Sequence, residues 1–594
     1  MYLTPEMKDV GKVNFNAAIG STPVRREFLM EQVRQGLASK SGLGAYYFGY
    51  ENKVKEPVRV GVIGTGDEGS VLIGALNPDF MQVKAIADIR PYNVWRAFNG
   101  DYESPTARLV RPGLMKIYDW KTEDEAHENV KIYGDYSELI KNAKDDGIEA
   151  VIIGLPLHLH APCAIAAMQA GLHVITEKLM AHSVRECKEM ALVAKKQSEE
   201  LESPLYLAVG HQRHYNILYN NAVELIRKGT LGDLHYIRAQ WHRGNLPGRD
   251  SWQMPLPKDA KPGDRLAGVL EKQLESMQKS LKVLQEAMPK AKTATEREAI
   301  RAEMADLEIR IVQKTSQISD KDVDAAKYGY EAATIGAGEK AYDRPAIEEL
   351  IRWRLWNRTG GGLMAELGSH QLDAASIFIA AVHGGEKQIP LSVSAAGNRP
   401  LFPRDRDIED HVYCVFEFPA PGYDPKDSIA NRKKIGVQYA SINGNGFGGY
   451  GETVLGTSGT LVLETEKDAM LWKAADTLNK THVVPKDGDP AALETWEPGD
   501  VESAAIGQLA TLPAERGYAE ELEHFAWCIR NPDPENQPRC TAKVALGDAV
   551  IALTTNMAAR KGARIDFKHE WFEIDSEETP EGDKPDISRY KPVV

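Results

Sequence analysis

The stretch "VRVGVIGTGDEGS", residues 58–70, decides the fold class of this chain. An apolar run at 58–63 leads directly into the glycine pattern GxGxxG at 64–69, and the next apolar run ends in Asp88, 19 residues beyond that pattern. In a dinucleotide-binding Rossmann fold, such glycines allow a tight turn and close approach of a pyrophosphate, the next helix N-terminus faces the phosphates, and the acid binds the ribose. The stretch therefore predicts a bound dinucleotide. The alternative is a tight strand–helix turn without a ligand.

The predicted cofactor is NAD. The Asp88 carboxylate can accept hydrogen bonds from the ribose hydroxyls and repels a 2′-phosphate. Arg90, two residues later, would attract such a phosphate, so NADP stays open as the alternative.

The apolar pattern changes along the chain and predicts two sheets. Residues 58–200 alternate strand-like runs with helical periodicity, which is typical of a parallel sheet flanked by helices; the expected strands are Val58–Ile63, Val83–Asp88, Ala150–Gly154, His173–Thr176 and Leu205–Val209. From about residue 213 strands follow one another with fewer helices between them: Leu234–Trp241, Ser392–Gly397, His411–Phe418, Val437–Asn443 and Thr453–Leu463. We expect an α/β fold with an N-terminal Rossmann doubly wound parallel sheet and a C-terminal α+β domain with a large, mostly antiparallel open sheet.

Residues 264–320 carry apolar residues at alternating spacings of three and four on both sides of a break at Pro289–Thr295. This pattern predicts a coiled helical hairpin, inserted in the second domain and dispensable for the chemistry. The expected organisation is an N-terminal arm (1–56), a dinucleotide-binding domain (57–212), a substrate and oligomerisation domain (213–575) that contains the hairpin, and a C-terminal tail (576–594).

Composition excludes several classes of function. The chain is 42% apolar and 27% charged, with a net charge of −14 and no long basic run, which argues against a nucleic-acid or anionic-membrane partner. The five cysteines are scattered and lack CxxC spacing, so we expect reduced, mostly buried thiols rather than disulfides or a zinc site. No apolar run approaches the roughly 18 residues of a membrane span.

Arg25-Arg26-Glu27-Phe28-Leu29 resembles the start of a twin-arginine export signal. In such a signal an uncharged apolar segment should follow, but here it contains the charged residues Glu31, Arg34 and Lys40. We therefore expect an amphipathic helix, or a signal that has lost its export function, and a cytoplasmic location. A periplasmic location is the alternative if the signal works.

Three further stretches carry polar residues at predicted strand ends or on a predicted helix: "PLHLH" at 156–160, "AGLHVITEK" at 170–178 and "GGGLMAELGSHQLD" at 360–373. With the glycine-rich turn, and in this order, they resemble the glucose–fructose oxidoreductase / inositol dehydrogenase family (Gfo/Idh/MocA). The resemblance runs from about Val58 to Phe572 and leaves out the arm and the hairpin.

The resemblance implies that Lys178 lies over the nicotinamide and the reacting hydroxyl, where it stabilises negative charge on the substrate oxygen. Glu177 would hold the cofactor or orient the lysine. The family has Glu-Lys-Pro here, and Leu179 replaces the proline. His160 matches a family position near the cofactor, although a packed histidine is the alternative. The complete set of expected cofactor contacts is Gly64, Thr65, Gly66, Asp67, Glu68, Gly69, Asp88, Arg90, Leu155, Pro156, His160, Glu177, Lys178 and Gln212.

The glycines at 360–362 precede a predicted helix on which Glu366 and His370 are four residues apart and therefore share a face. A histidine oriented by a carboxylate can act as a general base, and Glu366 should raise the pKa of His370. The resemblance implies that His370 accepts the hydroxyl proton; the family has aspartate at the position of Glu366. The alternatives are a helix-face ion pair or a metal pair, and no further ligands are spaced for a metal.

Polar and aromatic residues in "VGHQRHYN" (209–216) and "QWHRGNLPGRDSW" (240–252) suit a hydroxylated ligand, although any one of them could be ordinary structure. We predict that the substrate contacts Arg213, Tyr215, Trp241, His242, Arg243 and, on the predicted catalytic helix, Asp373.

The predicted function is an NAD(P)-dependent oxidoreductase that transfers a hydride between a secondary alcohol of a sugar, polyol or glycoside and nicotinamide. His370, Lys178 and Glu366 would be catalytic, and no metal is expected. The partners would be a small sugar or polyol and further copies of the chain, forming a dimer or tetramer through the C-terminal sheet. The alternatives are an NAD-dependent enzyme that cleaves glycosides through a transient keto-sugar, and a non-catalytic sugar or nucleotide sensor.

Overall fold

The computed structural model describes residues 3–20, 40–474, 476–486, 489–495 and 516–593. Its first sheet has six parallel strands in the order β3-β2-β1-β4-β5-β6. In chain order these are β1 Val58–Ile63, β2 Met81–Ala87, β3 Lys131–Tyr133, β4 Ala150–Ile153, β5 His173–Glu177 and β6 Leu207–Gly210. The five predicted strands are confirmed with small shifts at their ends, and β3 was not predicted.

These strands read as continuous apolar runs because helices cover both faces of a parallel sheet. Every residue of β4 and β6 is buried. Helix α4 (Asp67–Ala75) packs with α5 (Pro91–Asn99), and α10 (His160–Gln169) packs with α11 (Val184–Leu201). The strand order reverses between β1 and β4, which opens a crevice at their carboxyl ends, where ligands of this fold bind.

The second sheet has eight strands in the order β15-β14-β13-β7-β12-β11-β10-β18, and only its β7–β12 pair is parallel. The strands are β7 Leu234–His242, β10 Ser392–Asn398, β11 His411–Pro419, β12 Lys434–Ile442, β13 Tyr450–Gly456, β14 Gly459–Glu464, β15 Asp468–Lys473 and β18 Ile565–Asp566. The expected large, mostly antiparallel sheet is confirmed. The single strand expected at 453–463 was wrong: the chain turns at Thr457-Ser458 between β13 and β14, and the apolar alternation continues across that turn.

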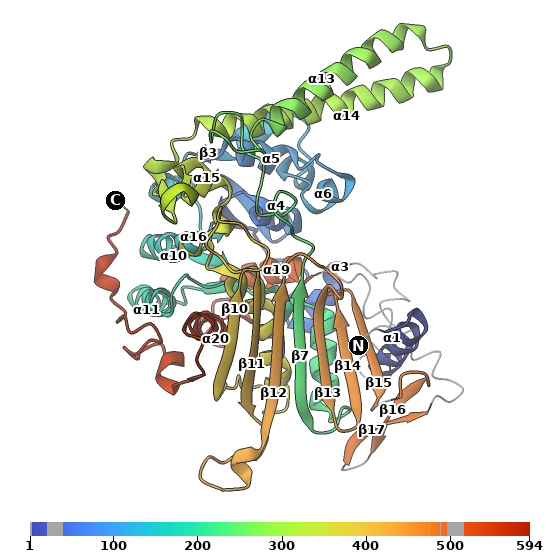
Figure 1. Ribbon diagram of the computed structural model, residues 1–594, viewed down its shortest axis with the longest axis vertical. Coiled ribbons are helices and arrows are strands. Elements are labelled where there is room, and N and C mark those ends of the chain that lie inside the picture. The colour runs from blue at the N-terminus through green and yellow to red at the C-terminus, as the bar shows by residue number, and fades with distance from the viewer. Residues whose placement is uncertain (1–2, 21–39, 475, 487–488, 496–515, 594) are drawn as a thin grey trace.

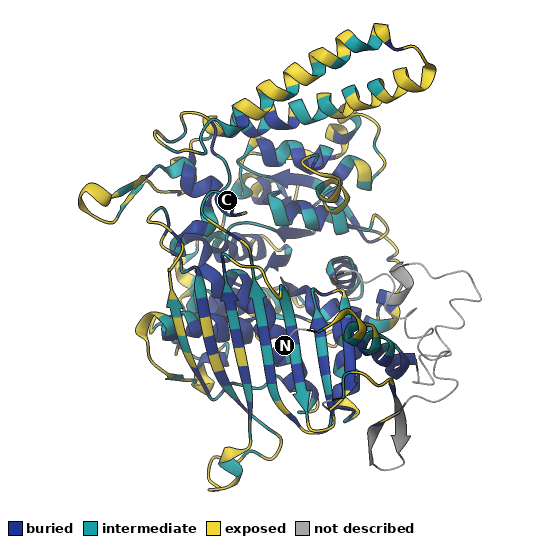
Figure 2. Cartoon of the chain, turned by 45° about the vertical axis from the view of Figure 1, so that its right-hand side comes forward, coloured by how far each residue is buried: buried dark blue, intermediate teal, exposed yellow. Residues whose placement is uncertain are grey.

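Helices cover one face of the second sheet, among them α12 (Ile217–Arg227), α17 (Ser369–Ala381) and α20 (Ala542–Lys561). Residues along β11 alternate between buried and exposed, and the exposed set includes Tyr413 and Val415. Exposed positions are visible along the strands on the face that Figure 2 turns toward the viewer. This half-covered sheet explains why its strands have a clearer period of two than those of the first sheet.

The predicted hairpin is present as α13 (Val269–Ala287) and α14 (Ala294–Ser319), which pack against each other and project from the molecule (Figure 1). The base of α14 packs against α5 of the first domain. Coiled-coil geometry stays a prediction.

The N-terminal arm includes α1 (Pro5–Gly20), which packs along β15, where Asn14 Nδ2 donates to the carbonyl oxygen of Leu471 at 3.0 Å. A second helix, α3, spans Lys40–Phe48. The twin-arginine stretch and its predicted amphipathic helix lie outside the described residues. In the described part of the chain, no helix is long and apolar enough to cross a membrane. All five cysteines are free and buried, as expected.

Candidate active site

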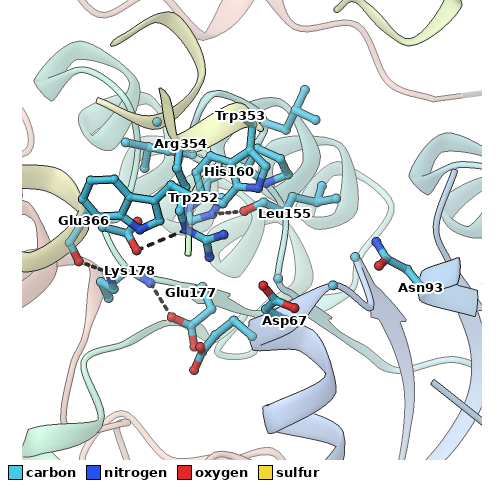
Figure 3. A pocket seen from close by; sticks show the side chains of 18 of the residues that line it. Asp67, Asn93, Leu155, His160, Glu177, Lys178, Trp252, Trp353, Arg354 and Glu366 are labelled. Carbon is cyan, nitrogen blue, oxygen red and sulfur yellow. Dashed lines mark hydrogen bonds and ion pairs between the residues drawn. The ribbon is translucent and has the colours of Figure 1, made fainter. Parts of the chain in front are cut away.

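A cavity of about 800 Å³ opens at the carboxyl ends of the parallel strands and extends to the end of β7 (Figure 3). Most of the predicted site residues line it: Gly64, Gly66, Asp67, Glu68, Asp88, Arg90, Leu155, Pro156, His160, Glu177, Lys178, Gln212, Trp241, His242, Arg243, Glu366 and His370. Segments more than 300 residues apart in sequence thus meet in one cavity. The described residues that line it do not include Thr65, Gly69, Arg213, Tyr215 or Asp373.

The glycine-rich turn has the geometry that a diphosphate needs. Gly64 has a φ of +81°, and a Cβ there would lie 2.7 Å from the carbonyl oxygen of Gly154. A Cβ on Gly69 would lie 1.9 Å from the carbonyl oxygen of Gly64. Glycine is therefore required at both positions, and the backbone stays accessible at the start of α4. The residues present fit a dinucleotide.

Thr65 and Gly69 are not among the described residues that line the cavity, and their contact with the cofactor stays a prediction. The Thr65 backbone N–H donates to Asp88 Oδ2 at 2.8 Å, and the Arg90 backbone N–H donates to Asp88 Oδ1 at 2.9 Å. Asn93 Nδ2 adds a contact of 3.1 Å to the same carboxylate. These donors fix the orientation of the Asp88 carboxylate directly after β2.

Asp67 in the first turn of α4 is balanced by arginines. Arg96 Nη1 donates to Asp67 Oδ1 at 2.8 Å. Burial alone would raise the pKa of Asp67, but attraction to Arg96, Arg354 and Arg111 holds this pKa below its ordinary range. The carboxylate therefore does not leave an uncompensated charge beside the helix N-terminus.

Lys178 and Glu366 meet in the cavity wall (Figure 3). Lys178 Nζ donates to the backbone carbonyl oxygen of Glu366 at 2.7 Å, while Glu366 Oε1 accepts from Arg354 Nε at 3.1 Å. The Lys178–Leu179 peptide bond is cis. His160 links the segments that follow β5 and β4, because its ring nitrogens lie 2.8 Å and 2.9 Å from the carbonyl oxygens of Leu179 and Leu155.

The predicted pairing of Glu366 with His370 was wrong. Residues Met364–Gly368 form a π-helical turn before α17, and the i→i+5 bonding of such a turn moves residues four apart off a common face. The carboxylate of Glu366 consequently contacts Arg354. Figure 3 shows Arg354 reaching toward Glu366.

His370 is buried and uncharged at neutral pH. Its ring centroid lies 5.5 Å from that of Trp241 and 6.4 Å from that of His211. Burial, followed by the positive charges of Lys178 and Arg213, holds the pKa of His370 well below its ordinary value. The expected rise in this pKa was wrong in direction. A neutral imidazole that lines the cavity is able to accept a proton.

Glu177 ends β5 and lines the cavity beside Lys178. Burial and the nearby charge of Glu68 raise the pKa of Glu177 to about 8. The side chain is therefore mostly protonated at neutral pH and can donate as well as accept a hydrogen bond.

Aromatic rings line the side of the cavity that the second domain provides. Trp241 stacks on Tyr450 with ring centroids 4.3 Å apart. The guanidinium carbon of Arg243 lies 5.5 Å from the ring centroid of Trp241 and 5.6 Å from that of Trp252. His242, at the end of β7, lies between Trp241 and Arg243 in sequence and also lines the cavity. Flat rings with polar groups between them suit a sugar or polyol.

Three predicted substrate residues belong to buried networks. Arg213 Nε donates to Glu466 Oε1 at 2.9 Å, Tyr215 Oη contacts His524 Nδ1 at 2.8 Å, and His214 Nε2 contacts Asp373 Oδ1 at 3.0 Å. Arg213 and Tyr215, on the 3₁₀ turn Gln212–Tyr215, and Asp373, on α17, contact these partners and are not among the described residues that line the cavity. Their contact with a substrate stays a prediction.

His211, Asp373 and Asp548 form a buried polar cluster with the partly exposed Lys387, and the ring of His211 lies near that of His370. His211, Asp373 and Asp548 are close enough together to hold a metal ion. The ammonium of Lys387 donates to Asp548 and lies 3.9 Å from Asp373, so a cation already balances these carboxylates. The expectation of no metal stays a prediction.

Several cavity residues were not predicted, among them Arg354, Tyr330 and Tyr450. The stretch "RWRLW" at 352–356 combines arginines and tryptophans and ends three residues before the glycines that begin at 360, and this signal could have identified Arg354. No comparable pattern surrounds Tyr330.

Comparisons with known proteins place the first domain. Residues 58–203 match the model of an oxidoreductase family with an NAD-binding Rossmann fold. The chain is similar to a 1-carboxy-3-chloro-3,4-dihydroxycyclohexa-1,5-diene dehydrogenase of Comamonas testosteroni, 28% identical over 31% of this chain and 37% of that protein. It is also similar to a glycosyl hydrolase family 109 protein of Stenotrophomonas maltophilia, 28% identical over 31% of this chain and 35% of that protein.

The chain thus spans less than two thirds of the length of either relative. A solved structure of myo-inositol 2-dehydrogenase from Lactobacillus plantarum aligns with 86% of this chain and 100% of that one, at 15% identity and a TM-score of 0.46.

Proposed function

We propose that the chain, whose residues 58–203 match the model of the Gfo/Idh/MocA oxidoreductase family, is an NAD-dependent oxidoreductase acting on a secondary alcohol of a sugar or polyol. One observation carries the proposal: the neutral imidazole of His370 and the ammonium of Lys178 line the same cavity as the glycine-rich turn. A proton acceptor, a cationic donor and a dinucleotide cradle together suit alcohol oxidation.

The residues divide the chemistry between them. The glycine-rich turn and the start of α4 would hold the diphosphate, and Asp88, which the Thr65 N–H holds in place, would hold the adenosine ribose. A bound nicotinamide would supply the acceptor for the hydride of the substrate carbon. His370 takes the proton of the same hydroxyl group, and Lys178 donates a hydrogen bond to the oxygen as its negative charge develops. Arg354 holds the side chain of Glu366, whose carbonyl oxygen positions Lys178.

Trp241, Trp252 and Arg243 support a cyclic polyhydroxylated substrate because they present rings and donors on one side of the cavity. The relative from Comamonas testosteroni is named as a dehydrogenase of a dihydroxylated ring. The relative from Stenotrophomonas maltophilia is named as a glycosyl hydrolase, which keeps glycoside cleavage through a transient keto-sugar as the second candidate.

We also propose that copies of the chain associate through the half-covered sheet, where Tyr413 and Val415 are exposed on β11. Light scattering on the purified protein would give its oligomeric state. A monomer at all concentrations would contradict this part of the proposal.

The test mixes the purified full chain with NAD⁺ and a panel of sugars, polyols and glycosides, and follows nicotinamide absorbance together with product release. Net reduction of NAD⁺ supports the dehydrogenase. Release of an aglycone without net reduction supports the second candidate. Dinucleotide binding without either reaction contradicts an enzymatic role, and His370→Ala is the control that must remove whichever activity is found.

A further inference from the structure

The base of the helical hairpin contacts the segment that follows Asp88. Asp320 comes directly after α14 and is almost completely buried, with a relative exposure of 1%. Its Oδ2 accepts from Arg90 Nε at 2.9 Å and lies 2.8 Å from Arg90 Nη2, and its Oδ1 accepts from the Tyr92 backbone N–H at 3.1 Å. One carboxylate of the insertion therefore makes three contacts with the start of α5.

Arg90 is the residue best placed to bind an adenosine phosphate. It lies two residues after Asp88, lines the cavity, and has the planar guanidinium that binds phosphate bidentately. In the structure two nitrogens of this guanidinium are directed to Asp320 instead. A ligand that needs Arg90 must first separate a buried ion pair and leave Asp320 uncompensated, which is unfavourable.

Further contacts fix Asp320 in place. Gln313, on the last turns of α14, accepts from the Tyr102 backbone N–H at 2.8 Å and donates to Asp101 Oδ1 at 3.0 Å. The chain after Asp320 then contributes Lys327, Tyr328 and Tyr330 to the cavity wall.

A small apolar cluster closes the same region. Ala325, Tyr330 and Leu350 form its buried part, and Ile89 packs against them. Ile89 stands between Asp88 and Arg90 in sequence, so the chain that follows the hairpin also contacts the ribose-binding strand end.

We propose that the insertion, through Asp320, selects NAD over NADP by holding Arg90 away from the 2′ position of the adenosine ribose. The inference rests on the proposed function. Asp88 and Asp320 then act together: Asp88 repels a 2′-phosphate, and Asp320 removes the cation that would otherwise compensate for that repulsion. The sequence of the hairpin shows only an apolar packing pattern. In this proposal the hairpin also contributes to the cofactor site through Asp320.

The test measures the dissociation constants of NADH and NADPH, by nicotinamide fluorescence, for the full chain and for Asp320→Asn. Asparagine has nearly the same shape, so the Tyr92 contact remains, while the charge that holds Arg90 is lost. We expect NADPH affinity to rise about tenfold, because the released Arg90 could form a charge-assisted hydrogen bond with the 2′-phosphate. NADH affinity should stay nearly unchanged. Asp322→Asn is the matched control, because Asp322 is an exposed acid of the same 3₁₀ turn and should change neither constant.

A second variant keeps the test decisive if Asp320→Asn folds poorly. In the otherwise unchanged chain, Arg90→Gln should leave NADPH affinity as weak as before, because Arg90 is already held by Asp320. A fall in NADPH affinity would overturn the inference, as would an unchanged NADPH-to-NADH ratio in Asp320→Asn. An unmodified chain that binds neither dinucleotide would instead overturn the proposed function, and this inference with it.

Discussion

At the scale of single residues, the ammonium of Lys178 is the donor closest to the proposed reaction. Lys178→Met keeps the apolar stem and removes the donor that stabilises charge on the substrate oxygen. We expect kcat to fall by about 10²–10³-fold, as for other donors of this kind, while NADH affinity and the melting temperature change little. Steady-state kinetics and a fluorescence titration on the same preparation would check this. Turnover close to that of the unmodified chain would remove Lys178 from the mechanism.

The pKa of His370 leads to a prediction about pH. Because burial, Lys178 and Arg213 hold this pKa well below its ordinary value, the base is already neutral near pH 6, and oxidation should lose rate only at lower pH. Lys178→Met removes a positive charge, so the pKa of His370 should rise and the acid limb of the pH–rate profile should move to higher pH. Glu366→Gln removes a negative charge, so the limb should move to lower pH.

The measurement is kcat/KM from pH 4.5 to 8 for each variant, with His370→Ala as the variant that should lose the limb. An acid limb at pH 7 in the unmodified chain would mean that another group titrates. Shifts in the same direction for Lys178→Met and Glu366→Gln would also contradict the assignment.

The sequence predicted the residues whose chemistry is tied to a motif. Gly64, Lys178 and His370 stand in patterns that have few other uses, and all three line the cavity. The buried partners of Arg213 and Asp373 could not be predicted, because a charged residue looks the same in a sequence whether its partner is a ligand or a buried side chain. The pairing of Arg90 with Asp320 was out of reach, since the two lie far apart in the chain and no local pattern links them.

At the scale of elements, the catalytic helix shows the limit of periodicity. The sequence around Glu366 fits a regular helix, and only tertiary packing reveals the π turn at Met364–Gly368 that redirects its side chain. The hairpin shows the converse case. Its apolar period predicted α13 and α14 correctly, yet nothing in that period indicates which polar residues at the base contact the cofactor domain.

The contacts at that base revise the expectation that residues 264–320 are dispensable for the chemistry. Besides Gln313 and Asp320, the segment contains Asp264, whose Oδ2 accepts from the buried Arg352 at 2.7 Å. Replacing the outer part, residues 278–303, by a short Gly-Ser link should leave kcat and NADH affinity unchanged, since this part is mostly exposed.

Removing 264–320 entirely should weaken NADH binding by at least about tenfold, because several buried polar groups lose their partners. Fluorescence titration and thermal unfolding of the two deletions, side by side, would check this. Equal NADH affinity in both would restore the view of the hairpin as a separate arm.

At the scale of the whole molecule, both terminal segments pack against elements that are distant in the sequence. Helix α1 packs on β15, more than 400 residues later, and the tail after β18 packs on α11. The order of the strands and the two-sheet architecture follow from patterns within each segment. The packing of α1 on β15 and of the tail on α11 could not be predicted in this way, because no local sequence pattern links the residues that make contact.

One buried lysine donates three hydrogen bonds to the tail. Lys188 of α11 is fully buried, and its Nζ donates to the backbone carbonyl oxygens of Glu570, Ser576 and Glu578 at 2.9, 3.0 and 2.7 Å. Lys188→Met would fill the same space but remove the donor that these three carbonyl oxygens share, although the oxygen of Glu570 also accepts from the Glu573 backbone N–H at 3.4 Å. We expect the free energy of unfolding to fall by about 2–4 kcal/mol, and residues after 570 to become sensitive to protease.

Lys195 provides the matched control, because it lies on the same helix and contacts the same tail. Its Nζ is 2.9 Å from Asp575 Oδ1, but both side chains are more than half exposed, at 55% and 70%. Water and salt screen such a pair, so Lys195→Met should leave the urea midpoint and the protease pattern unchanged. If the two variants lost stability equally, the tail would be held by charge at the surface, and burial of the Lys188 ammonium would not be the reason that the C-terminus stays on the first domain.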